Sequence, residues 1–332
     1  MRPRKVLLIL RAGTQHRAFL SISNPDPLRR PALSIALDWT PNTNHTGFFV
    51  AQELGYYAAS GIELRILSPA TDQYATTPAK KLALGEVDFA VAPFESVISL
   101  NTKPVPVPTV AVAALLQRDI SSIATLATSN IARPRDLDGR TYASYRARYE
   151  DAIVRQLVIN DGGTGNFPVT YPDKLGIWNT LLTGTADATW IFDNWEGVEA
   201  ETQGVALRTF ALADYGIPYG YSPVVMATAA GLAARRADYA AFVQATKKGF
   251  QFAITNPHEA TDILRQHVPE RDVRLIDLEK SQAAAAAFYG DARTWGTMEK
   301  GRVDAFLDWL IAHELETGAV KTLPLFTNSL LD

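Results

Sequence analysis

The sequence predicts an α/β fold in more than one compact lobe. Short apolar runs alternate with amphipathic helical stretches along the chain, which is typical of layered α/β architecture. The 332 residues exceed the ~250–300 at which a single hydrophobic core stops growing. Apolar residues make up 47% of the chain, as in ordinary globular proteins. We therefore expect two α/β lobes.

The first 32 residues are expected to lie outside this fold. Three basic residues precede the apolar run 6–10, which is the start of an export-signal pattern. Arg11 interrupts that run before it reaches the ~7–15 apolar residues of an export signal, and three prolines follow between residues 25 and 31. The segment is therefore either an atypical leader or a plain disordered segment.

The first third of the chain contains several short strand patterns. Continuous or alternating apolar runs predict buried strands at residues 33–37, 62–66, 87–91 and 110–116. A helical pattern starts at Gly47, and a short one covers residues 80–84.

The middle of the chain continues the alternation. A charged turn at 133–140 leads into an expected strand at 141–144 and a helix at 149–160, which Gly162 ends in a left-handed cap. Further on, the pattern predicts a helix at 175–182, a strand at 188–192 and a helix at 195–202.

After residue 220 the character changes. A last strand is expected at 224–228, and residues 233–316 are then nearly all helical in pattern. Alanine-rich runs strongly favour helix there. Asn256–Pro257, Val268–Pro269 and Gly290 are the expected interruptions.

The loop after the first strand is the most informative segment. It reads Asp-Trp-Thr-Pro-Asn-Thr-Asn-His-Thr-Gly over residues 38–47 and is dense in hydrogen-bonding groups. Ligands of open α/β sheets bind outside the carboxyl ends of strands, where such loops gather. We expect Asp38, Trp39, Asn42 and His45 at a small-molecule site, although such a histidine more often only holds its own loop.

This motif resembles the signature of the SsuA/THI5-like (NMT1/THI5) family, and the resemblance extends over about residues 33–316. It implies a type II periplasmic binding protein fold, with a ligand cleft between two lobes. Lobe 1 is then expected at 33–118 plus 222–332, and lobe 2 at 119–221. The resemblance also implies a periplasmic, monomeric solute-binding protein that serves ABC permease and ATPase subunits, with a cytoplasmic location as the alternative.

Three further segments carry candidate ligand contacts. Glu95 and Ser96 open a helix, where backbone N–H groups favour an anion or an acceptor, or where both residues merely cap the helix. Tyr145 and Arg146 follow the strand at 141–144. The planar guanidinium group of Arg146 either binds an anion or lies in solvent. Tyr219 and Tyr221 lie in a stiff loop rich in proline and glycine.

Trp195 and Glu196 form the fourth candidate segment, directly after the strand at 188–192. A buried glutamate is costly unless it is paired, so Glu196 either caps the next helix or awaits a donor. Flat aromatic faces and carboxylates suit an aminopyrimidine, because a carboxylate accepts two parallel N–H bonds. The resemblance makes Glu196 the first choice for that contact, ahead of Trp39 and Asn42.

Composition excludes several other classes of function. The net charge is −3, which argues against nucleic-acid binding. The absence of cysteine excludes disulfides and thiolate metal sites, and we expect no cofactor, no metal and no catalytic residues.

The resemblance also disfavours an enzyme. Pyrimidine synthases of the same family place a lysine and a histidine near the positions that Ala92 and Ser96 occupy in this chain. A sulfonate-, nitrate- or riboflavin-type carrier is the other alternative.

Overall fold

The computed structural model describes residues 31–172 and 179–332. The expected leader up to residue 30 and the first part of the helix expected at 175–182 lie outside these ranges. The remainder of that helix is present as α6 (Asn179–Thr183).

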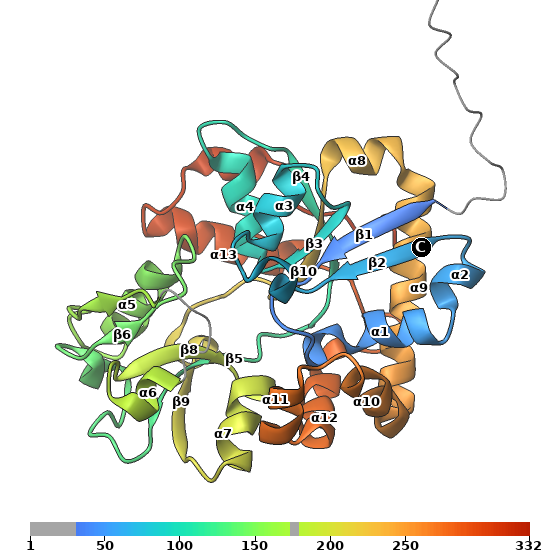
Figure 1. The fold of residues 1–332 in the computed structure, drawn as a ribbon. Helices are drawn as coiled ribbons and strands as arrows, with labels where there is room; N and C mark the ends of the chain where they lie inside the picture. Colours follow the sequence, from blue (N-terminus) through green and yellow to red (C-terminus); the bar gives the residue numbers. More distant parts are fainter. Residues whose placement is uncertain (1–30, 173–178) are drawn as a thin grey trace, which may run out of the picture. The chain divides into compact units, whose positions relative to one another are not determined.

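Five strands form the first sheet, in the order β2-β1-β3-β10-β4 (Figure 1). They are β1 (Ala32–Ala36), β2 (Glu63–Leu67), β3 (Phe89–Ala92), β4 (Thr109–Ala114) and β10 (Val224–Thr228). β1 pairs in parallel with β2 and β3, whereas β10 returns from late in the chain and runs antiparallel to both β3 and β4. The apolar runs that predicted these strands are confirmed to within two residues at each end.

Most of the helices belong to the lobe of the first sheet. They are α1 (Thr46–Glu53), α2 (Tyr56–Ala59), α3 (Pro78–Ala83), α4 (Phe94–Thr102), α8 (Ala229–Ala234), α9 (Arg236–Thr255), α10 (Pro257–Arg265), α11 (Glu270–Leu275), α12 (Leu278–Tyr289) and α13 (Lys300–Ala312). The three predicted interruptions are confirmed. α10 starts at Pro257, α11 starts directly after Pro269, and Gly290 ends α12 with a φ of 84°.

The second sheet has the order β7-β6-β8-β5-β9. Its strands are β5 (Ser121–Leu126), β6 (Tyr142–Ala143), β7 (Val169–Thr170), β8 (Ala188–Phe192) and β9 (Leu207–Ala211), with helices α5 (Glu150–Asn160), α6 and α7 (Val198–Thr202). β5 runs antiparallel to β8 and β9, so this sheet is also mixed.

Four elements of the second lobe differ from the sequence expectation. The strands β5, β7 and β9 were not expected, and β5 and β9 contain no continuous apolar run. The single helix expected at 195–202 is instead a π-helical turn at Asp193–Gly197 that leads into α7. π-turns of this kind are rare and often occur at functional sites.

The fold class is confirmed, because two mixed α/β sheets each form a lobe. The strands of the first sheet come from residues 32–114 and 224–228, and those of the second from 121–211. The chain thus passes twice between the lobes, at residues 115–120 and again at 212–223. The lobe boundaries at 118/119 and 221/222 stay a prediction.

One arginine of α13 contacts both crossing segments. The Arg302 guanidinium donates to the backbone oxygens of Gln117 and Gly220, the latter at 3.2 Å. It also lies 4.1 Å from the centre of the Tyr221 ring. Arg302 therefore fixes the two crossings relative to one another.

α1 and α9 pack closely at two glycines. A Cβ atom on Gly249 would lie 2.0 Å from the backbone oxygen of Gly47, and one on Gly47 would lie 2.0 Å from the Phe250 ring. The close contact with α9 holds α1 in place directly after the loop at residues 38–45.

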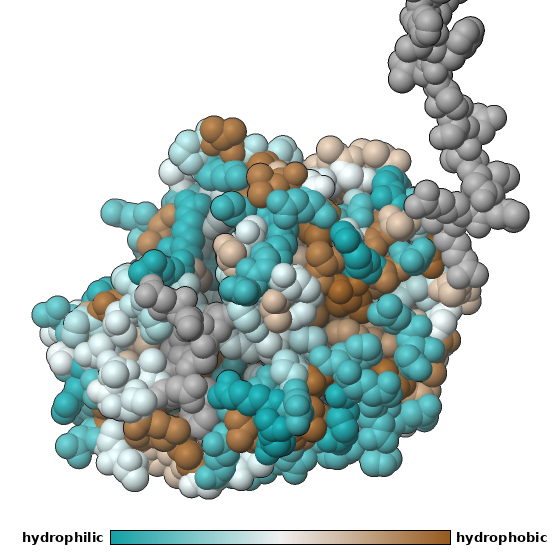
Figure 2. All heavy atoms as spheres, viewed as in Figure 1, coloured by the Kyte–Doolittle hydropathy of each residue, from teal (hydrophilic) through white to brown (hydrophobic). Residues whose placement is uncertain are grey.

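The exterior in Figure 2 mixes polar and apolar side chains, with the apolar ones in scattered groups over the described residues. Within residues 31–172 and 179–332, no helix combines the length and apolar character needed to cross a membrane.

Candidate functional site

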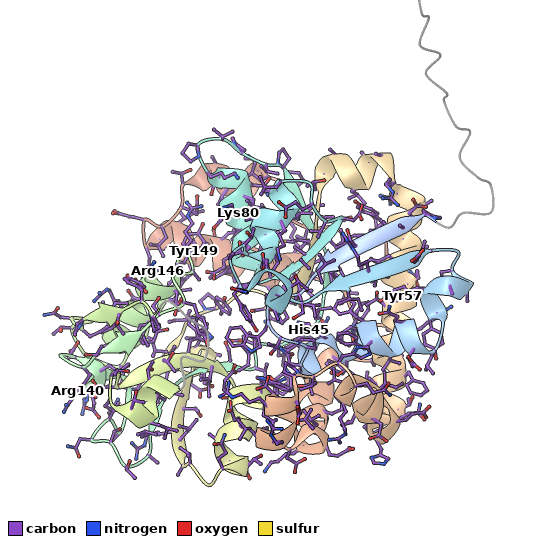
Figure 3. The ribbon with its side chains drawn as sticks, in the orientation of Figure 1. His45, Tyr57, Lys80, Arg140, Arg146 and Tyr149 are labelled. Carbon is purple, nitrogen blue, oxygen red and sulfur yellow. The ribbon has the colours of Figure 1, made fainter. Side chains whose placement is uncertain are left out.

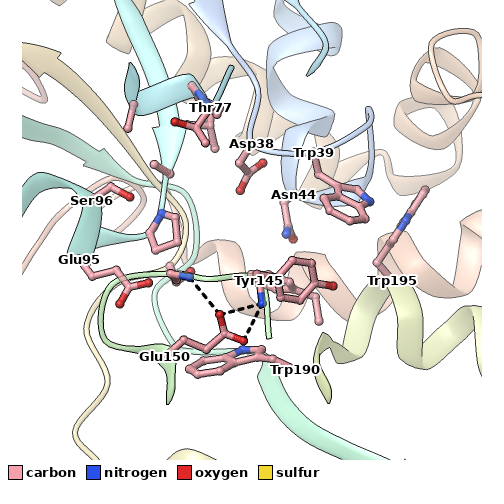
Figure 4. Close-up of a pocket in the computed structure, with 18 of the residues that line it drawn as sticks. Asp38, Trp39, Asn44, Thr77, Glu95, Ser96, Tyr145, Glu150, Trp190 and Trp195 are labelled. Carbon is pink, nitrogen blue, oxygen red and sulfur yellow. Dashed lines mark hydrogen bonds between the residues drawn. The ribbon is translucent and has the colours of Figure 1, made fainter. Parts of the chain in front are cut away.

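A cavity of about 370 Å³ lies where the loops of both sheets meet (Figure 4). The first lobe contributes its wall from the segments around residues 38–44, 77–79 and 91–96. The second lobe contributes the segments 145–150 and 190–196, and Tyr219 and Ser222 line the cavity from a crossing. Such a cavity size and its apolar walls with a few polar groups are typical of small-molecule sites.

Asp38 is held at the first-lobe wall by a buried histidine (Figure 3 labels His45). The His45 Nε2 atom lies 2.8 Å from Asp38 Oδ1, and His45 Nδ1 accepts the Asn42 backbone N–H at 3.3 Å. Because Nδ1 accepts, Nε2 carries the hydrogen and donates to Asp38. This bond fixes the Asp38 carboxylate while its second oxygen stays available.

Aromatic rings form much of the remaining wall. Trp39 and Tyr145 make an edge-to-face contact with ring centres 6.0 Å apart, which joins the two lobes at the cavity wall. The ring centres of Trp190 and Tyr219 lie 5.3 Å apart, and Trp195 also lines the cavity. Rings at these positions offer flat apolar faces to a planar ligand.

Glu196 is buried against the cavity, with 8% of its surface exposed. Its Oε2 accepts the Phe192 backbone N–H at 3.0 Å, so it does not cap α7, where no side-chain cap is present. Burial raises the pKa of Glu196 to about 7, and the N–H of Phe192 offsets only part of that effect. A carboxylate has about four acceptor sites, so Glu196 retains acceptor capacity for a ligand.

Glu150 is a second buried carboxylate at the wall. It accepts from the Tyr142 hydroxyl at 2.7 Å and from the backbone N–H groups of Tyr145 and Ala147 (dashed lines in Figure 4 mark bonds of this group). Burial raises the pKa of Glu150, and these three donors lower it. Its bonds close the loop at 144–147 around the carboxylate.

Glu95 and Ser96 line the cavity from the first turn of α4. The alternative that either residue caps this helix is wrong, because Pro93 occupies the cap position without a side-chain bond. Burial, followed by the charge of Glu150, raises the pKa of Glu95 to about 8.

Arg146 lies at the cavity rim and is exposed. Its guanidinium sits 4.7 Å from the centre of the Tyr171 ring, and its backbone has a φ of 62°. In this arrangement the positive charge stacks on an aromatic face of its own lobe.

The structure brings most of the predicted site residues to one cavity. Ten of them line it: Asp38, Trp39, Asn42, Glu95, Ser96, Tyr145, Arg146, Trp195, Glu196 and Tyr219. That each contacts a ligand remains a prediction.

His45 and Tyr221 are not among the described residues that line the cavity, so the structure gives their placement as ligand contacts no support. His45 is fully buried because it bonds to Asp38 and Asn42. The Tyr221 hydroxyl accepts the Glu299 backbone N–H at 2.9 Å, and its ring lies under Arg302. Both residues support the site from behind.

Several lining residues were not among the predicted contacts, including Asn44, Thr77, Glu150 and Trp190. Glu150 and Trp190 each lie directly beside a predicted segment. Glu150 follows a polar loop and Trp190 lies near the end of a strand, and these positions could have pointed to them. The sequence contains no comparable sign for Thr77, which also acts as the N-cap of α3.

A buried polar contact joins the lobes beside the cavity. Asn194 Nδ2 donates to Thr43 Oγ1 at 2.9 Å and to Asn44 Oδ1 at 3.0 Å, and Ser281 Oγ of α12 donates to the Asn194 backbone oxygen. All four side chains are buried. Among the described residues, no group of three or more His, Cys, Asp or Glu side chains is arranged to hold a metal ion.

Two mixed α/β sheets with a cavity between their loops define the type II periplasmic binding protein fold. A ligand-binding component of an ABC-type import system from Staphylococcus aureus, solved with zinc bound, superposes with a TM-score of 0.67 at 16% identity, over 91% of this chain and 98% of that one. The alkanesulfonate-binding protein SsuA from Xanthomonas axonopodis pv. citri gives 0.62 at 14% identity, over 86% and 93%.

Sequence comparison identifies the family. The NMT1/THI5-like family model matches residues 42–260, so the chain belongs to that family. The chain is 27% identical to a formylaminopyrimidine-binding protein from Halalkalibacterium halodurans, over 85% of each chain. It is also 26% identical to a 4-amino-5-hydroxymethyl-2-methylpyrimidine phosphate synthase from Legionella pneumophila, over 72% of this chain and 74% of the relative.

Proposed function

We propose that this protein is the solute-binding component of an ABC importer and that it captures a thiamine-pyrimidine precursor or a related nitrogen heterocycle. Similarity to the formylaminopyrimidine-binding protein over 85% of both chains supports the ligand class. The proposal includes a periplasmic, monomeric protein that delivers its ligand to permease and ATPase subunits.

The observation that carries the proposal is the chemistry of the cavity wall. Among the described residues, four carboxylates line it, those of Asp38, Glu95, Glu150 and Glu196, together with aromatic rings. Arg146 is the one lysine or arginine among the described lining residues, and its charge lies over Tyr171. Acceptors and flat faces suit a planar ring with N–H donors and oppose a sulfonate or nitrate ion.

Glu196 is the proposed partner of the aminopyrimidine edge. Its carboxylate can accept two parallel N–H bonds, and charge-assisted bonds of this kind are about twice as strong as neutral ones. Trp39, Trp195 and Tyr219 supply the faces between which the ring would lie. Contacts from both lobes favour the closed arrangement, because ligand binding supplies the energy of closure.

We further propose that the protein binds its ligand without transforming it. The enzyme alternative is supported by the similarity to a relative that is named a synthase. Against it, the chain has no cysteine, and Ala92 and Ser96 occupy the positions where the synthases would place their lysine and histidine. Turnover of pyridoxal phosphate by the purified protein would revive the enzyme alternative.

Calorimetric titration tests the proposed ligand class. We expect formylaminopyrimidine or hydroxymethylpyrimidine to bind and taurine and nitrate to be silent. Glu196→Gln should weaken binding of the pyrimidine by about 10- to 100-fold, since one charge-assisted bond is worth roughly 1.5–3 kcal/mol.

Glu201→Gln is the matched control. Glu201 lies five residues away on α7, is exposed and pairs with Lys280, so its substitution should leave affinity unchanged. Binding of anions alone would favour a sulfonate-type carrier, and binding of riboflavin alone would favour a riboflavin carrier. Either result contradicts the pyrimidine proposal.

A further inference from the structure

Glu316, which follows α13 of the first lobe, contacts two side chains of the second lobe. Its Oε1 atom accepts the Tyr149 hydroxyl and pairs with the Arg148 guanidinium (Figure 3 labels Tyr149). Thr102, at the end of α4, places its Oγ1 atom 3.0 Å from the same Glu316 oxygen and accepts a bond from Arg148 at 2.6 Å. We call these four residues the Glu316 contact.

The Glu316 contact is mostly shielded from water. Only 6% of the Glu316 side chain and 1% of Tyr149 are exposed. Hydrogen bonds to a charged group are stronger than neutral ones, and they strengthen further where water is excluded. The Glu316 contact is therefore a strong link between the two lobes.

The turn after α13 holds Glu316 in this position. The backbone N–H groups of Leu315 and Glu316 both donate to the Leu310 oxygen, at 2.9 and 3.3 Å. Just before them, Glu314 has a φ of 58°, a left-handed conformation that residues other than glycine rarely adopt. A strained residue of this kind persists only where the surrounding structure holds it. The turn is thus a defined structure that presents Glu316 to the second lobe.

The second-lobe partners of Glu316 belong to a loop that also walls the cavity. Residues 145–147 line the cavity, and Arg148 and Tyr149 follow directly in the chain. The Glu150 carboxylate accepts backbone N–H groups at both ends of the lining stretch, which ties this loop into one unit. The Glu316 contact therefore acts on the cavity wall, although its own four residues are not among the described lining residues.

We propose that the Glu316 contact is a latch that stabilises the closed arrangement of the lobes and thereby raises ligand affinity without touching the ligand. A ligand that needs both walls binds fully only to the closed arrangement. Its apparent dissociation constant therefore rises as the closed population falls. In this role Glu316 is a positioning residue, and the role does not depend on which ligand the cavity takes.

Water can reach the latch when the lobes separate. Arg148 is 39% exposed, and Thr102, Arg148 and Glu316 border a second cavity of about 720 Å³. Breaking a buried ion pair is costly because each charge is left without a partner. Here water entering from the second cavity can hydrate both ions, so the latch can open. Added salt should weaken it, since the pair is partly exposed.

Distances between two spin labels test the latch without any ligand. The chain has no cysteine, so labels attach only at Leu84→Cys on the first lobe and Ile159→Cys on the second, both exposed positions. We expect the doubly labelled parent protein to populate a short, closed distance. Glu316→Ala and Tyr149→Phe should each shift that population toward longer distances.

Glu314→Ala is the matched control, because Glu314 is exposed and lies on the same turn. Its distances should equal those of the parent. The effects of Glu316→Ala and Tyr149→Phe should be less than additive when combined, because both remove one shared bond. Tyr149→Phe removes only a hydroxyl, so it decides the question if Glu316→Ala does not fold. Unchanged distances in the folded variants would overturn the latch.

Binding of hydroxymethylpyrimidine gives a second measurement, which rests on the function proposed above. Glu316→Ala and Tyr149→Phe should each weaken binding about tenfold, mainly through faster dissociation in stopped-flow mixing, while Glu314→Ala stays within about twofold. A contact with a purely structural role would lower the melting temperature and leave dissociation unchanged, which would contradict the latch. If the wild-type protein does not bind this pyrimidine, the proposed ligand class fails, and the label distances still decide the latch.

Discussion

Two buried glutamates in the cavity wall are costly to ionise. Glu95 and Glu196 each lie in the wall with less than a tenth of their surface exposed. Burial shifts the pKa of both toward the neutral form. The empty protein therefore carries a cost whenever these groups are ionised, and a ligand with N–H donors removes that cost.

This cost predicts how the empty protein responds to pH. The pKa values of about 8 for Glu95 and about 7 for Glu196 lie above the ~4.3 of an unfolded glutamate. Their contribution to stability is complete below pH ~4.3 and is lost as the pH rises through ~7–8. Between pH 5.5 and 8.5 the melting temperature should fall, and Glu95→Gln should flatten that fall.

Differential scanning calorimetry of the ligand-free protein at several pH values measures the effect. The groups that act on these carboxyls are Glu150 and Arg148 at Glu95, and Glu199 and Asp193 at Glu196. A slope that is identical in wild type, Glu95→Gln and Glu201→Gln would show that Glu95 is not responsible for the fall.

At the residue scale, the motif at 38–47 leads to the cavity, because its polar groups follow a buried strand and several of them line the wall. That these residues contact a ligand stays a prediction. For His45 the structure shows the alternative, a histidine that bonds Asp38 from behind, which a sequence does not distinguish from one facing a ligand. The partners of Tyr221, Glu299 and Arg302, are about 80 residues away in the chain, so the sequence contains no sign of them.

At the scale of elements, strand β5 shows why a polarity pattern can fail. It contains Ser121, Ser122 and Thr125, all nearly fully buried. Each hydroxyl has a partner, at Asp119, Asp193 and the backbone oxygen of Asp187 respectively. Because hydrogen bonds offset the burial of these polar groups, the strand needs no apolar run. A sequence gives no warning of partners that only the fold provides.

The close contact of α1 and α9 allows a test at the element scale. Gly249→Ala places a methyl group against the Gly47 backbone oxygen, so the helices must separate. Overpacking of this kind costs roughly 1–3 kcal/mol, more than the ~1 kcal/mol that alanine gains over glycine within a helix. We expect a loss of about 1–2 kcal/mol in the free energy of urea unfolding.

Gly301→Ala in α13 is the matched control. No atom lies within 4 Å of the position of its Cβ, so alanine should be neutral or slightly stabilising there. Equal effects of the two substitutions would mean that helix propensity, rather than the α1–α9 contact, controls both.

At the scale of the whole protein, the two passages of the chain between lobes control their relative movement. We propose that lobe 1 comprises residues 33–118 and 222–332 and lobe 2 residues 119–221. Arg302 connects the two passages at Gln117 and Gly220. Asn194 also connects the lobes, through Thr43 and Asn44.

Removing Arg302 should loosen both crossings together. Arg302→Met keeps the aliphatic stem and removes the guanidinium, which leaves two carbonyl groups without their donor. We expect a loss of roughly 1–3 kcal/mol in unfolding free energy. Hydrogen exchange should increase at residues 115–120 and 219–223 in the same variant.

Arg274→Met is the control, because Arg274 is exposed and pairs only locally with Glu270. Surface pairs of this kind contribute ~0–1 kcal/mol, so stability should barely change. Unaltered exchange at both crossings in Arg302→Met would contradict the role assigned to this arginine.

Among the tryptophans that the structure describes, Trp39, Trp190 and Trp195 line the cavity. Indole emission depends on the polarity and the π-systems around it, so a guest among these rings should change the intrinsic fluorescence without any label. Occupancy can then be followed in real time by stopped-flow mixing. A Trp39→Phe variant would show how much of that optical signal arises at the first-lobe wall.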